Sequence, residues 1–118
     1  MAAKDDLGRR GEDIAAASIV AAGLTVLDRN WRCPLGEIDI VALDGKETVF
    51  IEVKTRSSTA FGHPLEAITA QKLARLRRLA AAWCEAHPGS RGAIRIDAIA
   101  VIAPPAGSPT VEHLVRVF

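Results

Sequence analysis

Residues 36–54, GEIDIVALDGKETVFIEVK, contain two runs rich in isoleucine and valine on either side of an Asp-Gly pair. Such runs around an Asp-Gly turn are typical of a β-hairpin, so we expect strands at about 36–43 and 48–55. Four charged side chains interrupt these apolar strands: Glu37, Asp39, Glu52 and Lys54. They form either a metal site or the ordinary solvated face of an amphipathic sheet.

The pairing of the two strands decides whether the acids meet. Because side chains alternate along a strand, the apolar positions of each strand should share one side and the charged positions the other. The expected apolar side of the first strand comprises Ile38, Ile40 and Ala42. A two-residue loop at Asp44-Gly45 would set Asp39 opposite Phe50, whereas a four-residue loop over 44–47 would set Asp39 opposite Glu52. We favour the four-residue loop, because opposed carboxylates with Cβ atoms about 4.5–5.5 Å apart can bind one divalent ion and would otherwise repel.

The flanking segments complete an element order of α-β-β-β-α-β-β. An alanine-rich helix is expected from about Leu7 to Ala22, and a second helix, capped by Thr69, is expected to run to about His87. Further strands are expected at 24–31, 93–103 and 110–118, with a turn at Cys33-Pro34 and a loop over 57–67. Residues 1–118 should therefore form one domain of the α/β (α+β) class.

Composition and net charge limit which classes of protein this chain can belong to. The 118 residues are 49% hydrophobic and 25% charged, with a formal net charge of +1, so any nucleic-acid surface must be a local patch. The chain shows neither a signal peptide nor a run long enough to cross a membrane, which predicts a cytoplasmic protein. Cys33 and Cys84 lack metal-ligand spacing and are expected to pack as small hydrophobic residues.

The order of motifs resembles the YraN family of small bacterial proteins over roughly residues 8–118. The motifs that carry the resemblance are GRRGEDIAA, RNWR, GEIDIVA, FIEVKTRSS, FGHP and RIDAIAV. An aspartate on one strand before E-x-K on the next also resembles the PD-(D/E)XK nuclease core, and the layout is similar to archaeal Holliday-junction resolvases. The resemblance implies a restriction-endonuclease-like fold, with a central mixed five-stranded sheet flanked by helices. It does not establish the substrate, because function belongs to the site and not to the fold.

Carried over residue by residue, the resemblance predicts four catalytic residues: Glu12, Asp39, Glu52 and Lys54. Asp39 and Glu52 would bind Mg²⁺ or Mn²⁺ together with the backbone carbonyl of Val53, and Glu12 would complete or orient this site. Lys54 would orient or help deprotonate the attacking water. The helical stripe that Glu12 shares with alanines and Ile19 would bring Glu12 toward the sheet, although ordinary surface charge is the alternative.

The second helix departs from the family pattern. Family members tend to carry Lys-Gln early in this helix, whereas the aligned pair here is Lys72-Leu73, with a glutamine at Gln71. Gln71, Arg75 and Arg78 share a stripe that faces either a phosphate backbone or solvent. The residues expected to bind nucleic acid are Arg56, Gln71, Lys72, Arg75 and Arg78.

Three functions remain open. The first is a metal-dependent endonuclease that hydrolyses phosphodiester bonds, with branched or otherwise structured DNA as its partner. The second is a nucleic-acid-binding module with little or no cleavage, which the near-neutral charge and Leu73 favour, and the third is an adaptor, against which the intact acids count. Residues 55–68, with Phe61 and His63, would either order over DNA or form a surface loop. A homodimer is a further expectation.

Overall fold

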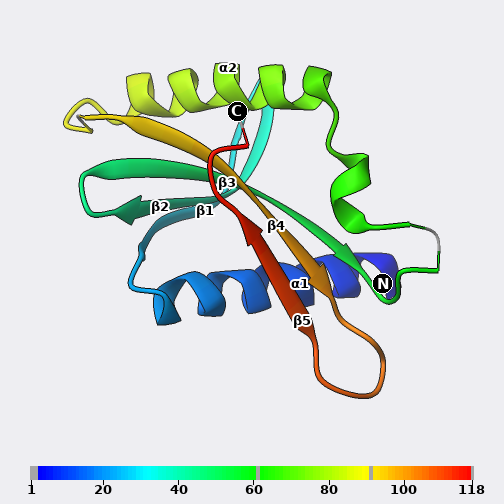
Figure 1. Ribbon diagram of the computed structural model, residues 1–118. Coiled ribbons are helices and arrows are strands. Elements are labelled where there is room, and N and C mark those ends of the chain that lie inside the picture. Colours follow the sequence, from blue (N-terminus) through cyan, green and yellow to red (C-terminus); the bar gives the residue numbers. More distant parts are fainter. Residues whose placement is uncertain (1–2, 61, 91, 118) are drawn as a thin grey trace.

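The computed structural model describes residues 3–60, 62–90 and 92–117. It consists of one five-stranded sheet with a helix on each face (Figure 1). The elements are α1 (Ala3–Ala21), β1 (Thr25–Cys33), β2 (Gly36–Asp44), β3 (Glu47–Arg56), the 3₁₀ helix η1 (Pro64–Ala67), α2 (Ala70–Ala86), β4 (Ile94–Ile102) and β5 (Thr110–Leu114). This confirms the predicted order and adds η1. No helix in the described ranges is long and apolar enough to span a bilayer.

The strands lie in the order β1-β2-β3-β4-β5, which makes β3 the central strand. Neighbours run antiparallel except for β3 and β4, which are parallel, so the sheet is mixed. The parallel pair needs a crossover connection, and α2 lies on that connection. The central position of β3 explains why residues 48–51 and Val53 are all buried. The predicted five-stranded mixed sheet is confirmed.

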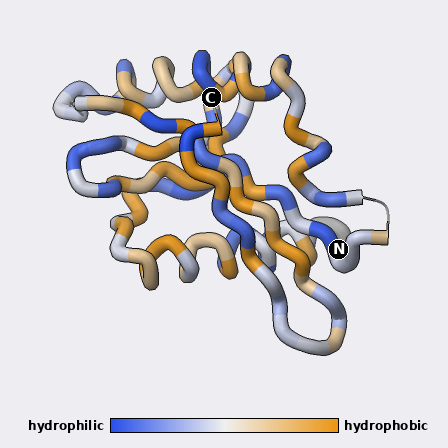
Figure 2. Tube along the Cα trace, in the orientation of Figure 1, coloured by the Kyte–Doolittle hydropathy of each residue, from blue (hydrophilic) through white to orange (hydrophobic). Residues whose placement is uncertain are grey.

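Both faces of the sheet are covered, so the apolar residues form two clusters. Beneath α1, Ala15 packs with alternate residues of β2, β3 and β4. Beneath α2, Leu79 and Trp83 pack against Val41 and Phe50 of the hairpin. Figure 2 shows the corresponding hydrophobic residues along the strands between the two helices. Since Val41 and Phe50 were expected on the charged side of the hairpin, that side is not a simple water-facing surface.

The turn between β2 and β3 is shorter than the predicted loop. Asp44 and Glu47 still pair with each other, so only Gly45-Lys46 forms the turn, and the expected four-residue loop is wrong in length. Gly45 has a φ of +61°, in the left-handed region that glycine enters at little steric cost. The register is the predicted one, since Asp44 pairs with Glu47 and Ile40 with Ile51, and the pairing ends one residue before Asp39 and Glu52.

Several boundaries differ from the prediction. β1 extends to Cys33, which pairs with Gly36, so the turn lies at residues 34–35. β5 ends at Leu114 and does not continue as the predicted strand over 110–118. It ends there because Arg116 has a φ of +57° and donates its backbone N–H to the Asp97 carboxylate at 3.0 Å. Phe118, the last residue of the predicted strand, lies outside the described residues.

The 3₁₀ helix η1 organises the segment that was expected to be an irregular loop. His63 caps η1 by accepting the backbone N–H of Leu65 on Nδ1 at 3.1 Å. The other ring nitrogen of His63 lies 2.8 Å from Glu112 of β5. These contacts tie the segment to the sheet. Phe61, which belongs to the loop that would either order over DNA or form a surface loop, lies outside the described residues.

Candidate metal and nucleic-acid site

The candidate site begins where β2 separates from β3. The paired part of the two strands ends at Ile40 and Ile51, while β2 stays paired with β1 further along. Ile40 packs beneath α1, but Ile38 packs beneath α2. The expectation that these two isoleucines share one face is therefore wrong, because the alternation of faces along β2 is interrupted between them, at Asp39. Asp39 lies where β2 and β3 separate, and this point of separation is the split.

The Asp39 carboxylate bonds to β3 at the split. Its Oδ2 accepts the backbone N–H of Val53 at 2.8 Å, in the part of β3 that β2 no longer pairs. This bond satisfies an amide that would otherwise lack a strand partner, and it fixes the orientation of the carboxylate. The local fold thus holds Asp39 beside β3.

Asp39 and Glu52 form a close acid pair. Burial is the largest cause that raises the pKa of Asp39 from 3.8 to about 8, followed by the negative charge of Glu52 and a hydrogen bond between the two carboxyl groups. The hydrogen bond from Val53 lowers the pKa by less, and the charge of Glu12 raises it a little further. Asp39 therefore keeps a proton near neutral pH, as expected for two carboxyl groups that cannot both ionise.

A hollow of about 240 Å³ between the sheet and α2 contains the acid pair. Its charged lining residues are Glu37, Asp39, Glu52, Lys54, Lys72 and Arg75. Lys54 Nζ lies 4.0 Å from Glu52 Oε1, and the two side chains are 24% and 20% exposed. Glu37 also binds Arg32 at 2.8 Å. Asp39, Glu52 and Lys54, all predicted as catalytic residues, thus share one hollow.

Glu12 lies on α1 and lines a different hollow, of about 460 Å³, together with Val53, Thr55 and Arg56. Its Oε1 accepts a hydrogen bond from Asn30 Nδ2 at 2.7 Å. Within the described ranges, no three His, Cys, Asp or Glu side chains are close enough to form a ready-made metal cage. The role of Glu12 as a third ligand or orienting group stays a prediction.

The donor set of the acid pair fits a magnesium or manganese ion. Mg²⁺ retains several waters in most proteins and needs only one or two carboxylates, which Asp39 and Glu52 can supply. The negative charge of Glu52 is among the causes that raise the pKa of Asp39, and a bound divalent cation would offset this repulsion. The backbone carbonyl of Val53 remains a predicted additional ligand.

Three basic residues of α2, Lys72, Arg75 and Arg78, form a basic surface beside the acid pair, called here the basic wall. A hollow of about 480 Å³ along the start of this helix is lined by Thr69, Gln71, Lys72, Arg75 and Arg78. Lys72 and Arg75 also line the hollow of the acid pair, so the two hollows meet at these side chains. Arg56, also predicted to bind nucleic acid, lies instead in the hollow of Glu12. Leu73 packs against the apolar cluster beneath α2 and offers no polar group.

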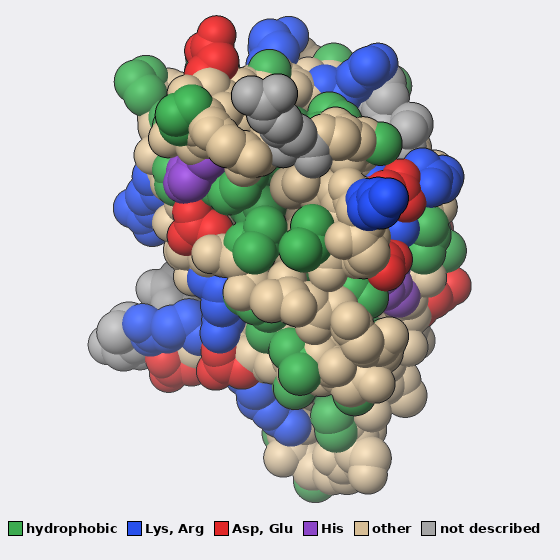
Figure 3. Space-filling model, turned by 90° about the vertical axis from the view of Figure 1, so that its left-hand side faces the viewer, with side chains coloured by type: hydrophobic (Ala, Val, Ile, Leu, Met, Phe, Trp, Pro, Cys, Tyr) green, Lys and Arg blue, Asp and Glu red, His purple; other side chains and the backbone are tan. Residues whose placement is uncertain are grey.

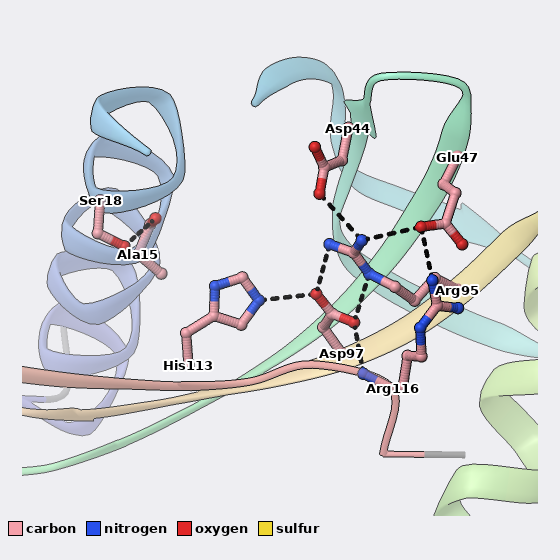
Figure 4. Close-up of polar contacts among 8 residues, drawn as sticks. All are labelled: Ala15, Ser18, Asp44, Glu47, Arg95, Asp97, His113 and Arg116. Atoms are coloured by element: carbon pink, nitrogen blue, oxygen red, sulfur yellow. Dashed lines mark hydrogen bonds and ion pairs between the residues drawn. The ribbon is translucent and has the colours of Figure 1, made fainter. Parts of the chain in front are cut away.

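Sequence reasoning missed a polar cluster around Arg95 and Asp97 of β4. Figure 4 shows the Arg95 guanidinium between Asp97 and two acids of the hairpin turn, Asp44 and Glu47. Asp97 is fully buried and also lies 2.7 Å from Nε2 of His113. Burial raises the pKa of Asp97, but hydrogen bonds from His113, Arg95 and the Arg116 backbone outweigh it and hold the pKa below the usual value. The alternating sequence RIDAIAV gave no signal of this cluster.

The chain is similar to known proteins along most of its length. The sequence model of the uncharacterised protein family UPF0102 matches residues 11–101. A UPF0102 protein of Arthrobacter sp. (strain FB24) is 57% identical over 114 residues, which cover 97% of each chain. A UPF0102 protein of Clavibacter michiganensis is 53% identical over 95% of each chain. A UPF0102 protein of Frankia alni is 51% identical over all of this chain and 98% of the relative.

Proposed function

The chain belongs to the UPF0102 family, which is the same family as YraN, and we propose that it is a metal-dependent endonuclease that hydrolyses phosphodiester bonds in branched or structured DNA. The observation that supports this proposal is the acid pair of Asp39 and Glu52, which shares a hollow with Lys54 at the split between β2 and β3. The names of the relatives state no activity, so the proposal rests on the chemistry of this site.

The proposed chemistry assigns a role to each of these side chains. A bound Mg²⁺ or Mn²⁺ would polarise the scissile phosphate and make water a better nucleophile. Asp39, oriented by the Val53 N–H, and Glu52 would hold the ion. Lys54, whose ammonium lies beside Glu52, would orient the attacking water and screen the charge of the phosphate. This positional role needs no change in the protonation of Lys54.

The basic wall of α2 supports a nucleic-acid substrate. Lys72 and Arg75 lie beside the acid pair, and Arg78 continues the wall along the helix. Cations at such positions would bind backbone phosphates on the way to the site and offset the negative charge of the acids. The net charge of +1 makes this local concentration more informative, because basic residues are not in general excess.

A binding module without cleavage is the second candidate. Related nucleases often have a glutamine early in this helix, whereas Leu73 at the aligned position is packed into the apolar cluster. α2 would then contribute phosphate contacts only, through residues that need no metal. DNA binding that is unchanged by chelation of the metal, without cleavage, is the behaviour expected of this candidate.

Cleavage assays with a lysine variant test the proposal. Lys54→Ala should retain the fold and lower the rate of cleavage of branched DNA by about 10²–10⁴-fold, the range for loss of a proton-transfer or positioning group. Lys46→Ala, which changes an exposed lysine of the hairpin turn, is the matched control and should cleave like the wild type. Branched, single-stranded and duplex DNA are compared with Mg²⁺ and with Mn²⁺. If the wild type cleaves none of them, the endonuclease proposal is wrong.

A further inference from the structure

Asn30 of β1 connects α1 to the split in the sheet. Its side-chain amide donates to Glu12 Oε1 at 2.7 Å, a short hydrogen bond between groups 18 positions apart. The pairs on either side of it, Arg29 with Ile40 and Trp31 with Ile38, place Asn30 across from Asp39. Asn30 therefore lies between the carboxylate of α1 and the carboxylate at the split.

The backbone at Asn30 suits asparagine in particular. Its φ is +52°, in the left-handed region that asparagine tolerates better than most residues because its short polar side chain can bond locally. A β-branched or long side chain would be strained there. Asparagine also supplies the amide N–H that a carboxylate can accept, which glycine, the other residue suited to this backbone, does not.

The neighbouring pair of residues provides a contrast. Asp13 follows Glu12 on α1 and is bound by Arg29, which precedes Asn30 on β1, at 2.9 Å. Two adjacent acids of one helix are thus held by two adjacent residues of one strand, the first acid by a neutral amide and the second by a cation. A cation would offset the charge of Glu12, whereas an amide orients the carboxylate and leaves its negative charge intact.

We propose that Asn30 is a positioning residue, which holds the Glu12 carboxylate toward the split at Asp39 so that its negative charge supports a divalent cation bound by Asp39 and Glu52. This inference rests on the proposed metal site and extends it to a residue that does not itself bind the metal. Glu12 lines one hollow with Val53, and the backbone N–H of Val53 binds the Asp39 carboxylate. Groups that orient a metal-binding carboxylate typically change metal affinity by 10–100-fold when they are removed.

Calorimetric titration with Mn²⁺ alone tests the inference on the intact protein. Asn30→Gly keeps the backbone conformation but removes the amide, and it should weaken Mn²⁺ binding by about 10-fold. Arg29→Ala is the matched control, because it removes the equivalent contact to Asp13, and its Mn²⁺ affinity should stay within about twofold of the wild type. Circular dichroism and thermal unfolding of each variant check that the fold is kept.

A double-variant cycle shows whether Asn30 acts through Glu12. In the Glu12→Gln background, Asn30→Gly should cause no further loss of Mn²⁺ affinity, because the carboxylate that it orients is gone. An equal loss in both backgrounds would overturn the inference, as would equal losses in Asn30→Gly and Arg29→Ala. If Asn30→Gly binds Mn²⁺ like the wild type while Asp39→Asn does not, the inference fails and the metal site stands. If the wild type binds no Mn²⁺, both fail.

Discussion

Asp39 holds a proton that the unfolded chain would release. Its pKa is about 8 in the folded protein, against a usual value of 3.8. Between these values the folded protein binds one more proton than the unfolded chain, so the free energy of unfolding must fall as the pH rises. The stability contributed by this proton is fully present below pH 3.8 and is lost as the pH rises through about 8.

Replacement of Asp39 by asparagine should remove this pH dependence. The new side chain would retain an oxygen for the Val53 N–H, so the change removes the charge and keeps the contact. In metal-free buffer, the wild type should lose roughly 2–4 kcal/mol more than Asp39→Asn between pH 5 and pH 8. Urea unfolding with a chelator measures the difference, and Asp6→Asn, which changes an exposed acid, serves as the control. Equal pH slopes for the wild type and Asp39→Asn would contradict the assignment of the proton.

The helix α1 lies against the strand β3 at a glycine, Gly11. A Cβ atom on Gly11 would overlap Oγ1 of Thr55 and lie 2.7 Å from its Cβ, so Gly11 permits the close approach. Gly11→Ala should therefore destabilise the fold by about 1–3 kcal/mol, as overpacking does. The same change at Gly8, where no atom lies within 4 Å, should stabilise by about 0.5–1 kcal/mol. Chemical denaturation compares the two, and equal effects would show that the helix does not lie this close to β3.

The cluster on β4 ties the hairpin turn to the end of the chain. Asp97→Asn removes the fully buried one of three carboxylates that bind Arg95, while Asp44 and Glu47 stay in contact, so it should cost about 1.5–3 kcal/mol at pH 7. Because the pKa of Asp97 is lowered, its contribution is present above the usual pKa and is lost as the pH falls through the folded value. The deficit measured by urea unfolding should therefore shrink in acid. A deficit at pH 7 as small as that of Asp6→Asn would contradict this account.

Pattern predicts the elements and restricts the hairpin to registers that keep its apolar positions on one side, but it left two such registers open, and the pairing of the acids decided between them. It does not predict the split at Asp39, which depends on Ile38 packing beneath α2 after the pairing with β3 has ended. Contacts between side chains that are far apart in the sequence cannot be predicted from pattern either. Arg95 binds acids about 50 positions earlier in the chain, and no local period marks such a contact.

With a net charge of +1, the whole protein would bind the proposed DNA substrate only through a restricted surface. Figure 3 shows the face at the left of Figure 1, where acidic and basic side chains are intermixed. This face therefore has no broad basic patch. The basic wall of α2 is the alternative. Electrostatic binding through a few cations should be measurable as a shallow dependence on salt.

Variants of this wall should change the salt dependence of DNA binding. Lys72→Ala and Arg75→Ala should each lower the slope of log affinity against log salt concentration by about 1, the effect of one lost phosphate contact. Arg9→Ala removes an exposed arginine of α1 that is paired with Asp6, and its slope should match the wild type. Fluorescence anisotropy with branched DNA at several salt concentrations measures the slopes. Unchanged slopes for both wall variants would place the DNA elsewhere.

We propose that a divalent cation takes the place of the proton on Asp39 when it binds the acid pair. Calorimetric titration with Mn²⁺ at pH 7, repeated in buffers of different ionisation enthalpy, measures both affinity and proton release. The wild type should release about one proton for each ion bound, because a carboxylate must be deprotonated to bind a metal. Asp39→Asn should bind at least about 10-fold more weakly and release no proton. Equal affinity of the two proteins, without proton release by the wild type, would contradict the claim.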